Sequence, residues 1–370
     1  WNMAELEDIY LPYKPKRKTR ASAAREKGLE PLAEIIMTQK EDKLEAIAEK
    51  YLNDEVPDIE SALAGARDII AEWINENTDA RNKIRQLFER DAIISSKVIE
   101  KKKDEGIKYQ DYFDFSEPLE RCAGHRLLAI RRAEQEGILR VSISIDNENA
   151  IECLEKIFIK NKNESAVQVG LSIKDAHKRL LAPSIETEFK NSSKAKADEE
   201  AIRVFSENLR QLLLSPPLGP KVTMAIDPGF RTGCKLVCLD QQGNLLHHDT
   251  IFPHPPQPKV DEATEKIKGL LKKYKVEAIA IGNGTAGRET ERFIKSLLGE
   301  TSTTEIFMVN EAGASIYSAS ETAREEFPDL DLTFRGAISI GRRLMDPLAE
   351  LVKIDAKSIG VGQYQHDVNQ

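Results

Sequence analysis

The stretch PPLGPKVTMAIDPGFRTGCKLVCLDQQGNLLHHDTIF, residues 216–252, decides the fold of the second half of the chain. Its closely spaced prolines cannot continue a helix, so residues 216–220 are expected to form a linker. Three apolar runs then follow, at residues 222–226, 232–239 and 245–252. Turn-forming residues separate the runs, a pattern typical of strands joined by tight turns.

Helices and strands are expected to alternate beyond this stretch. The expected elements are a helix at 261–274, a strand at 276–281, a helix at 286–298, a strand at 306–309 and a helix from Glu311. Three linked strands followed by strand–helix pairs predict a mixed sheet with helices on its faces. This order resembles that of ribonuclease H-like domains. We expect the domain to span residues 221–350, and residues 351–370 to begin a connection to further modules.

Residues 1–215 are expected to be mainly helical. Apolar side chains repeat there at helical spacing, as in the stripe Leu63, Ala66, Ile70 and Ile74. One isolated strand is expected at 139–145, and one helix is expected to start at Glu117-Pro118. The predicted fold class is therefore multidomain, with a mainly α N-terminal half followed by an α/β domain.

Composition excludes several classes of protein. The 370 residues carry 54 Lys and Arg against 62 Asp and Glu, a net charge of −8, so a uniformly basic nucleic-acid-binding protein is excluded. No apolar run approaches the ~20 residues of a membrane span, so no membrane association is expected. Four cysteines without a CxxC pair favour the reduced thiols of a cytoplasmic protein.

Three carboxylates are candidates for catalysis and metal binding. Asp227 ends the first strand of the sheet, Glu311 follows the last strand, and Asp346 lies in the last helical region. Converging on one sheet edge, they would hold two Mg²⁺ or Mn²⁺ ions ~4 Å apart for phosphodiester cleavage. Each also has an ordinary structural explanation: a turn, a favourable helix start, and the N-cap before Pro347.

Two further segments are candidates for binding nucleic acid. The turn Gly282–Glu289 would bring Asn283, Thr285 and Arg288 to a phosphate at a helix N-terminus, or Thr285 would simply cap that helix. A cationic arm near the N-terminus is suited to phosphates or to an acidic groove, although such a run is also common in solvated loops. Its cations are Lys14, Lys16, Arg17, Lys18 and Arg20.

Several blocks of sequence resemble the bacterial Tex family of transcription accessory proteins. LEDIYLPYKPKRKTRASAAREKGLEPLAE (6–34) and FSEPLERCAGHRLLAIRRAEQEG (115–137) resemble its N-terminal half. MAIDPGFRTGCKLVCLD (224–240), IAIGNGTAGRETERFI (279–294) and MVNEAGASIYSASE (308–321) resemble its YqgF-type ribonuclease H-like domain. RRLMDPLAELVKIDAKSIGVGQYQHDV (342–368) resembles the exit from that domain.

The resemblance implies a role and a longer protein. It implies RNA binding in transcription, and helix-hairpin-helix and S1 modules that do not occur before Gln370, so the chain is expected to be a fragment. Asp227, Glu311 and Asp346 match the three acidic positions of YqgF-type domains. The related Holliday-junction resolvases carry a glutamate where this chain has Gly282-Asn283, which weakens the prediction of cleavage.

Three functions are left open. The first is a scaffold that binds RNA or DNA together with the transcription machinery, with the missing S1 domain as its main RNA-binding part and no required cofactor. The second is a Mg²⁺- or Mn²⁺-dependent nuclease resembling Holliday-junction resolvases. The third is a pure protein-interaction scaffold, favoured by the acidic net charge.

Overall fold

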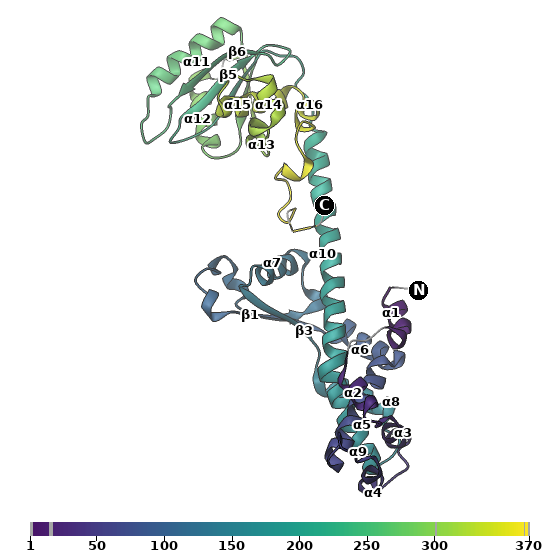
Figure 1. Ribbon diagram of the computed structural model, residues 1–370. Coiled ribbons are helices and arrows are strands. Elements are labelled where there is room, and N and C mark those ends of the chain that lie inside the picture. The colour runs from purple at the N-terminus through teal and green to yellow at the C-terminus, as the bar shows by residue number, and fades with distance from the viewer. Residues whose placement is uncertain (1–2, 15–17, 300–301, 366, 369–370) are drawn as a thin grey trace. The chain divides into compact units, whose positions relative to one another are not determined.

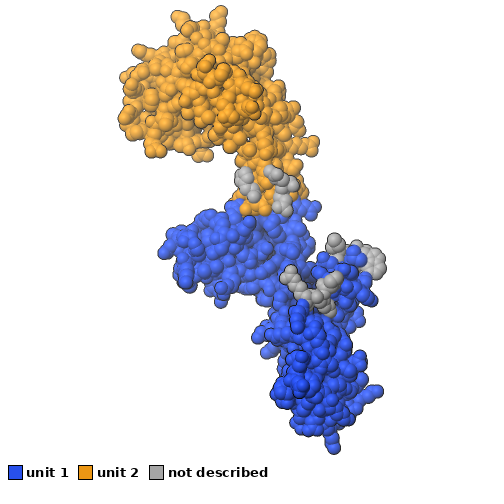
Figure 2. Space-filling view, viewed as in Figure 1, with its two compact units in different colours: residues 1–199 blue, residues 200–370 orange. Residues whose placement is uncertain are grey.

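The computed structural model describes residues 3–14, 18–299, 302–365 and 367–368 and divides into two compact units (Figures 1 and 2). The units are Trp1–Glu199 and Glu200–Gln370. Their boundary falls inside helix α10 (Ala182–Leu213). The prolines at 216–220, expected to separate two domains, therefore lie within the second unit, between α10 and the first strand of its sheet.

The first unit is built mainly from helices, as expected. They are α1 (Met3–Tyr10), α2 (Arg20–Glu26), α3 (Glu30–Thr38), α4 (Leu44–Ala48), α5 (Ile59–Glu76), α6 (Thr78–Asp91), α7 (Gly124–Gln135), α8 (Asn147–Phe158) and α9 (Glu164–Ala176). The stripe predicted on α5 is confirmed, because Leu63, Ala66, Ile70 and Ile74 are all buried. A π-helical turn, His177–Leu181, joins α9 to α10.

A three-stranded antiparallel sheet interrupts these helices. Its strands are β1 (Ile93–Val98), β2 (Asp114–Pro118) and β3 (Leu139–Ser144), in the order β2-β1-β3. The prediction of a single strand is thus wrong for β1 and β2. The segment Asp114–Pro118 is also a strand rather than a helix start, and α7 begins only at Gly124. Ile93-Ile94-Ser95-Ser96 has too short an apolar pattern to separate strand from helix.

The outer edge of β3 is covered by side chains of α10. Ile143 N–H donates to Glu186 Oε1 at 3.1 Å, and Lys190 Nζ donates to the carbonyl oxygen of Val141 at 2.9 Å. Glu186 and Lys190 are one helical turn apart and form an ion pair at 3.0 Å. An acceptor and a donor on one helix therefore take the place of a neighbouring strand.

The second unit contains the predicted mixed sheet. Its strands are β4 (Thr223–Asp227), β5 (Cys234–Leu239), β6 (Leu245–Ile251), β7 (Ala278–Gly282) and β8 (Glu305–Val309), in the order β6-β5-β4-β7-β8. The strands β4, β5 and β6 pair antiparallel, whereas β7 and β8 run parallel to β4. The carboxyl ends of β4, β7 and β8 therefore share one edge of the sheet.

Helices cover both faces of this sheet (Figure 1). The apolar residues of α11 (Val260–Tyr274) and α12 (Gly287–Leu298) pack with Met224 and Ile226 on one face. Those of α13 (Ala314–Ala319) and α15 (Leu332–Met345) pack with Ala225 and Val237 on the other. Two short helices, α14 (Glu321–Glu326) and α16 (Pro347–Leu351), flank α15 in sequence. Among the described residues, no helix is long and apolar enough to cross a membrane.

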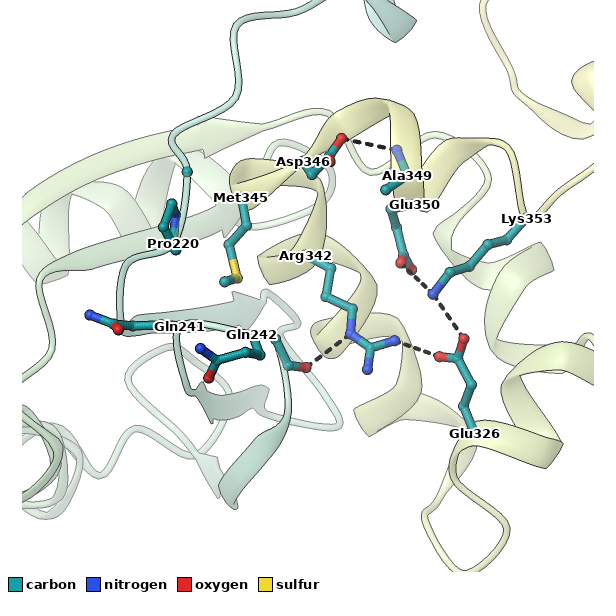
Figure 3. A pocket seen from close by; sticks show the side chains of 12 residues that line it. Pro220, Gln241, Gln242, Glu326, Arg342, Met345, Asp346, Ala349, Glu350 and Lys353 are labelled. Atoms are coloured by element: carbon teal, nitrogen blue, oxygen red, sulfur yellow. Dashed lines mark hydrogen bonds and ion pairs between the residues drawn. The ribbon is translucent and has the colours of Figure 1, made fainter.

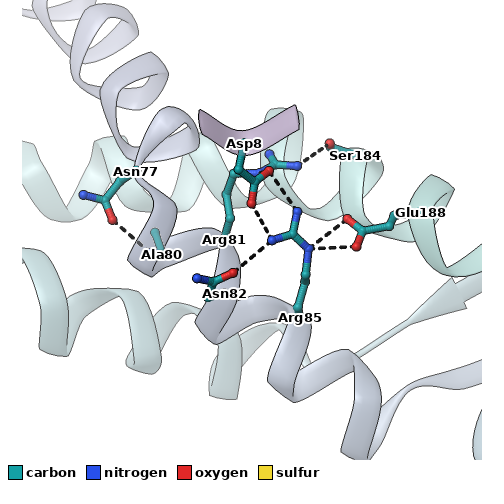
Figure 4. Close-up of polar contacts among 8 residues, drawn as sticks. All are labelled: Asp8, Asn77, Ala80, Arg81, Asn82, Arg85, Ser184 and Glu188. Atoms are coloured by element: carbon teal, nitrogen blue, oxygen red, sulfur yellow. Dashed lines mark hydrogen bonds and ion pairs between the residues drawn. The ribbon is translucent and has the colours of Figure 1, made fainter. Parts of the chain in front are cut away.

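A buried ion cluster fixes α1 within the first unit (Figure 4). The Asp8 side chain is only 2% exposed and accepts hydrogen bonds from Arg81 and Arg85 of α6. Arg85 also contacts Glu188 of α10 at 2.8 Å, and Arg81 donates to Ser184 at 3.1 Å. Hydrogen bonds from the two guanidinium groups and their positive charge outweigh burial and lower the pKa of Asp8.

Candidate functional site

Two of the three predicted carboxylates lie together at the sheet edge. Asp227 is the last residue of β4, and Glu311 is the second residue after β8. Burial, and then the negative charge of Glu311, raise the pKa of Asp227 to about 6, while Lys235 opposes this shift. A carboxyl with that pKa is about half-protonated near pH 6. The neutral form is favoured because it avoids both the desolvation of a charge and the repulsion from Glu311.

Glycines make room for the Glu311 carboxylate. A Cβ atom placed on Gly284 would lie 1.6 Å from Glu311 Oε1, and one on Gly282 would lie 2.4 Å from Oε2. Asn283 Oδ1 accepts a hydrogen bond from Glu311 N–H at 3.3 Å. The glycines of this turn therefore accommodate the protein's own carboxylate, and that negative charge disfavours a phosphate at the same place.

The structure does not bring Asp346 to this pair. Asp346 is the N-cap of α16, where its side chain accepts a hydrogen bond from Ala349 N–H at 3.0 Å (Figure 3). Gly336 of α15 faces Asp227, since a Cβ there would lie 3.3 Å from Asp227 Oδ2. Asp346 follows ten residues later, about 15 Å along a helix.

Backbone contacts confirm that the far end of α15 lies at the opposite edge of the sheet. Leu218 N–H donates to the carbonyl oxygen of Leu344 at 2.9 Å, and Gly219 N–H to that of Met345 at 3.1 Å. These residues precede β4, whereas Asp227 ends it. The expectation that Asp346 joins the acidic edge therefore fails, and the simpler N-cap explanation describes its position.

Asp346 instead borders a pocket of about 500 Å³ beside α15 and α16. The charged residues Glu326, Arg342 and Lys353 line it and pair with one another (Figure 3). Arg342 Nε also donates to the Gly243 carbonyl oxygen at 3.0 Å. This internal pairing ties α14, α15 and the β5–β6 turn together and makes the pocket a structural junction.

The acidic edge does not fit a two-metal site. Within the described ranges, no group of three or more His, Cys, Asp or Glu side chains is arranged to hold a metal ion. Two carboxylates remain, and neither Gly282 nor Asn283 supplies a third. Shared ligation of two ions needs more carboxylate oxygens than this pair offers.

Two family models match adjoining parts of the chain. The Tex central region-like model matches residues 39–205, and the model of the Tex protein YqgF-like domain matches residues 221–345. Together they cover more than half of the 370 residues. The chain belongs to the Tex family. The start of the YqgF-like match at residue 221 coincides with the end of the expected linker.

Curated relatives of the Tex chain agree with this assignment. It is 50% identical over 374 residues to the uncharacterized protein YdcI of Bacillus subtilis, covering 100% of this chain and 52% of the relative. It is 44% identical over 383 residues to the transcriptional accessory protein Tex of Neisseria gonorrhoeae, covering 100% and 49%. The human S1 RNA-binding domain-containing protein 1 is 36% identical over 390 residues, covering 99% and 38%. The chain thus spans about half the length of these bacterial relatives.

The predicted phosphate-binding turn of this Tex chain has a different geometry from the one expected. Thr285 is exposed and does not cap α12, whose N-cap is Ala286 in a left-handed conformation with φ of 65°. No side chain caps this helix start. Arg288 in its first turn is exposed. The helix N-terminus therefore remains open beside an exposed guanidinium group, while Asn283 is engaged with Glu311.

The cationic arm is exposed where the structure describes it. Lys14, Lys18 and Arg20 are exposed, and Lys18 forms a water-accessible ion pair with Glu26 at 3.4 Å. Lys16 and Arg17 lie outside the described residues. Tyr13, at 78% exposed, adjoins this arm. The described cations are thus accessible to a polyanion.

One buried side chain beside the candidate site was not predicted from the sequence. Arg343 is 4% exposed and donates to the carbonyl oxygens of Asn310 and Ala312, at 3.0 and 2.6 Å, on either side of Glu311. Burial lowers the pKa of Arg343 to about 10, with Glu350 and Glu311 opposing the shift. Because Arg343 lies 32 residues beyond the Glu311 loop, only the tertiary fold shows that it supports the loop.

Proposed function

We propose that this chain is a nucleic-acid-binding, scaffold-like part of a transcription accessory factor in the cytoplasm. RNA is the proposed ligand, and the transcription machinery the proposed protein partner. Membership of the Tex family supports the role in transcription, and the name of the human relative, which refers to RNA binding, supports the ligand. The exposed cations of the arm supply the charge for phosphate contacts.

We further propose that the YqgF-like domain, ribonuclease H-like in its order of elements, does not cleave nucleic acid. The observation that carries this proposal is the position of Asp346, which caps α16 about 15 Å along α15 from the acidic pair. Without it, no third carboxylate among the residues that the structure describes joins Asp227 and Glu311. Their role is then to shape the edge of the sheet.

One experiment tests both parts. The chain is incubated with labelled single-stranded RNA, single-stranded DNA and a four-way DNA junction, with Mg²⁺ or Mn²⁺. Mobility shifts report binding, and denaturing gels report cleavage. We expect shifted RNA that weakens as salt rises, and intact strands at every metal concentration.

Two results would overturn the proposal. Cleavage that disappears in Asp227→Asn and Glu311→Gln would establish the nuclease alternative, for which the paired carboxylates are the supporting feature. Absence of any salt-sensitive binding would favour the pure protein scaffold. Replacing Lys14, Lys18 and Arg20 with Gln tests the arm, since each lost phosphate contact lowers the salt slope by about 0.7 for a single strand.

A further inference from the structure

A second cationic surface lies at the end of α11, far in sequence from the arm. Residues 268–275, KGLLKKYK, contain four lysines and no acidic residue. All four lysines, Lys268, Lys272, Lys273 and Lys275, are exposed. None forms an ion pair with another described residue, although Lys273 Nζ lies 4.9 Å from the centre of the Tyr274 ring. We call these four residues the lysine surface.

Two acids that follow or adjoin the lysine surface, Glu277 and Glu305, already have partners. Glu277 Oε2, two residues beyond the lysine surface, accepts a hydrogen bond from Val222 N–H at 3.0 Å. Glu305, whose backbone N–H donates to the carbonyl oxygen of Glu277, forms an ion pair with Lys221 at 2.8 Å. No ion pair joins the four exposed lysines to these two carboxylates or to Glu265, the acid three residues before Lys268, so their ammonium groups remain accessible to an external anion.

Helix stability alone does not explain this arrangement. Lys272 and Lys273 lie in the last turn of α11, where cations interact favourably with the helix dipole. Lys268 lies a full turn earlier. Lys275 occupies the left-handed C-cap with φ of 54°, a position that Gly or Asn usually takes because a side chain there is strained. A charged residue thus occupies a site where glycine would be more stable.

An aromatic pair adjoins the lysine surface. The rings of Tyr274 and of His247 on β6 are stacked, with centres 6.0 Å apart and planes inclined by 30°. Tyr274 Oη donates to the carbonyl oxygen of Leu246 at 3.5 Å, which ties the ring to the sheet edge. Burial lowers the pKa of His247, which disfavours the charged form of its ring. Both rings are half-buried.

Lysines beside aromatic rings match the chemistry of an unpaired nucleic-acid strand. Ammonium groups contact its phosphates, and aromatic faces receive its bases, which a duplex keeps stacked inside. We propose that Lys268, Lys272, Lys273 and Lys275, together with the His247–Tyr274 pair, bind single-stranded nucleic acid. This surface deepens the proposed function and rests on it.

The main test compares two variants of equal charge. In the first, the four residues of the lysine surface are changed to Gln. In the control, Lys40, Lys43, Lys50 and Lys162, four exposed lysines of the first unit, are changed to Gln. Affinity of the whole chain for a fluorescent 20-nucleotide oligouridine is measured by anisotropy from 50 to 300 mM salt.

The lysine-surface variant is expected to bind about tenfold or more weakly at 100 mM salt, with a salt slope smaller by up to about 2.8, because single strands give about 0.7 per phosphate contact. The control is expected to keep the wild-type slope. Equal affinities and slopes in the two variants would overturn the inference while leaving the proposed function intact. No binding by the wild type would overturn both.

The aromatic part has its own test. Tyr274→Leu keeps an apolar side chain but removes the ring, and is expected to weaken binding about fivefold without changing the salt slope. Tyr274→Phe keeps the ring and is expected to bind like the wild type. If Tyr274→Leu also binds like the wild type, no base stacks there and the inference fails.

Competitors distinguish the class of partner. Unlabelled oligouridine should displace the probe, whereas a blunt duplex of equal length and poly-glutamate should displace it at least about tenfold less well. Equal displacement by the duplex or by poly-glutamate would overturn the assignment to single strands. If the variant with all four lysines changed to Gln does not fold, Lys275→Gly can be compared with the wild type in its place. This change relaxes the backbone and removes one cation of the lysine surface.

Discussion

Asp8 in the first unit and Asp227 in the second are both carboxylates withdrawn from water, yet their pKa values move in opposite directions. Asp8 lies between two arginines, and its pKa is lowered. Asp227 lies near Glu311, and its pKa is raised to about 6. Burial disfavours both charges, so the difference comes from the neighbours. Asp8 stabilises the packing of α1 against α6 through its ion pairs. Asp227 is instead destabilised in its charged form, and the packing of the sheet has to offset this cost.

Breaking the Asp8 cluster is expected to cause the largest loss in the free energy of unfolding. Arg85→Met leaves Asp8 and Glu188 without a cation that contacts both. Arg81 still pairs with Asp8 in this variant, so the expected cost is up to about 3 kcal/mol, the lower end of the range for a buried pair that is broken completely. Urea unfolding should show this loss in the free energy of unfolding. Arg90→Met, which removes an exposed pair with Asp91, should leave stability nearly unchanged; similar losses in both variants would contradict the comparison.

Removing the charge of Asp227 is expected to stabilise the protein, whereas breaking the Asp8 cluster destabilises it. Its pKa rises from about 4 in the unfolded chain to about 6 in the folded one, so the folded state loses stability as pH increases through this interval. Asp227→Asn should therefore raise the free energy of unfolding by about 2 kcal/mol at pH 7.5 and by little at pH 4. Denaturant unfolding at both values checks this. A variant less stable than the wild type at pH 7.5 would contradict this prediction.

The smallest change in the free energy of unfolding is expected at Lys275, an exposed charge. Lys275→Gly removes a side chain from a left-handed position and should raise the free energy of unfolding by about 1 kcal/mol. The same change should weaken binding of oligouridine, because it removes one cation of the lysine surface. Thermal unfolding and anisotropy measure the two quantities. A gain in stability with unchanged affinity would show that the backbone at Lys275 is strained but that its side chain does not bind nucleic acid.

The sequence predicted the mixed sheet because its strands are apolar runs with clear turn residues between them. Asp227 and Glu311 were correctly placed at one edge, since parallel strands end on the same side. Asp346 could not be placed in this way. Its position depends on the direction in which α15 crosses the sheet and on the length of that helix, which periodicity alone does not give.

Other features depend on contacts between distant parts of the sequence. The glycines at 282 and 284 suggested a phosphate-binding turn, but in the fold they make room for Glu311. The strands β1 and β2 were missed because Ser95, Ser96 and Ser116 interrupt their apolar pattern. The lysine surface lies within one short stretch, KGLLKKYK, that was not predicted as a binding segment, because only the structure shows that its four lysines are exposed and form no ion pair with other described residues.

The pair Glu186 and Lys190 on α10 has a consequence for the behaviour of the protein at high concentration. The edge of a sheet recruits strands from other chains when its N–H and carbonyl groups are unpaired. At β3 the N–H of Ile143 and the carbonyl oxygen of Val141 are already hydrogen-bonded to the two side chains. These two side chains therefore leave fewer free backbone groups for a strand of another chain to pair with, and they come from a helix rather than from a fourth strand.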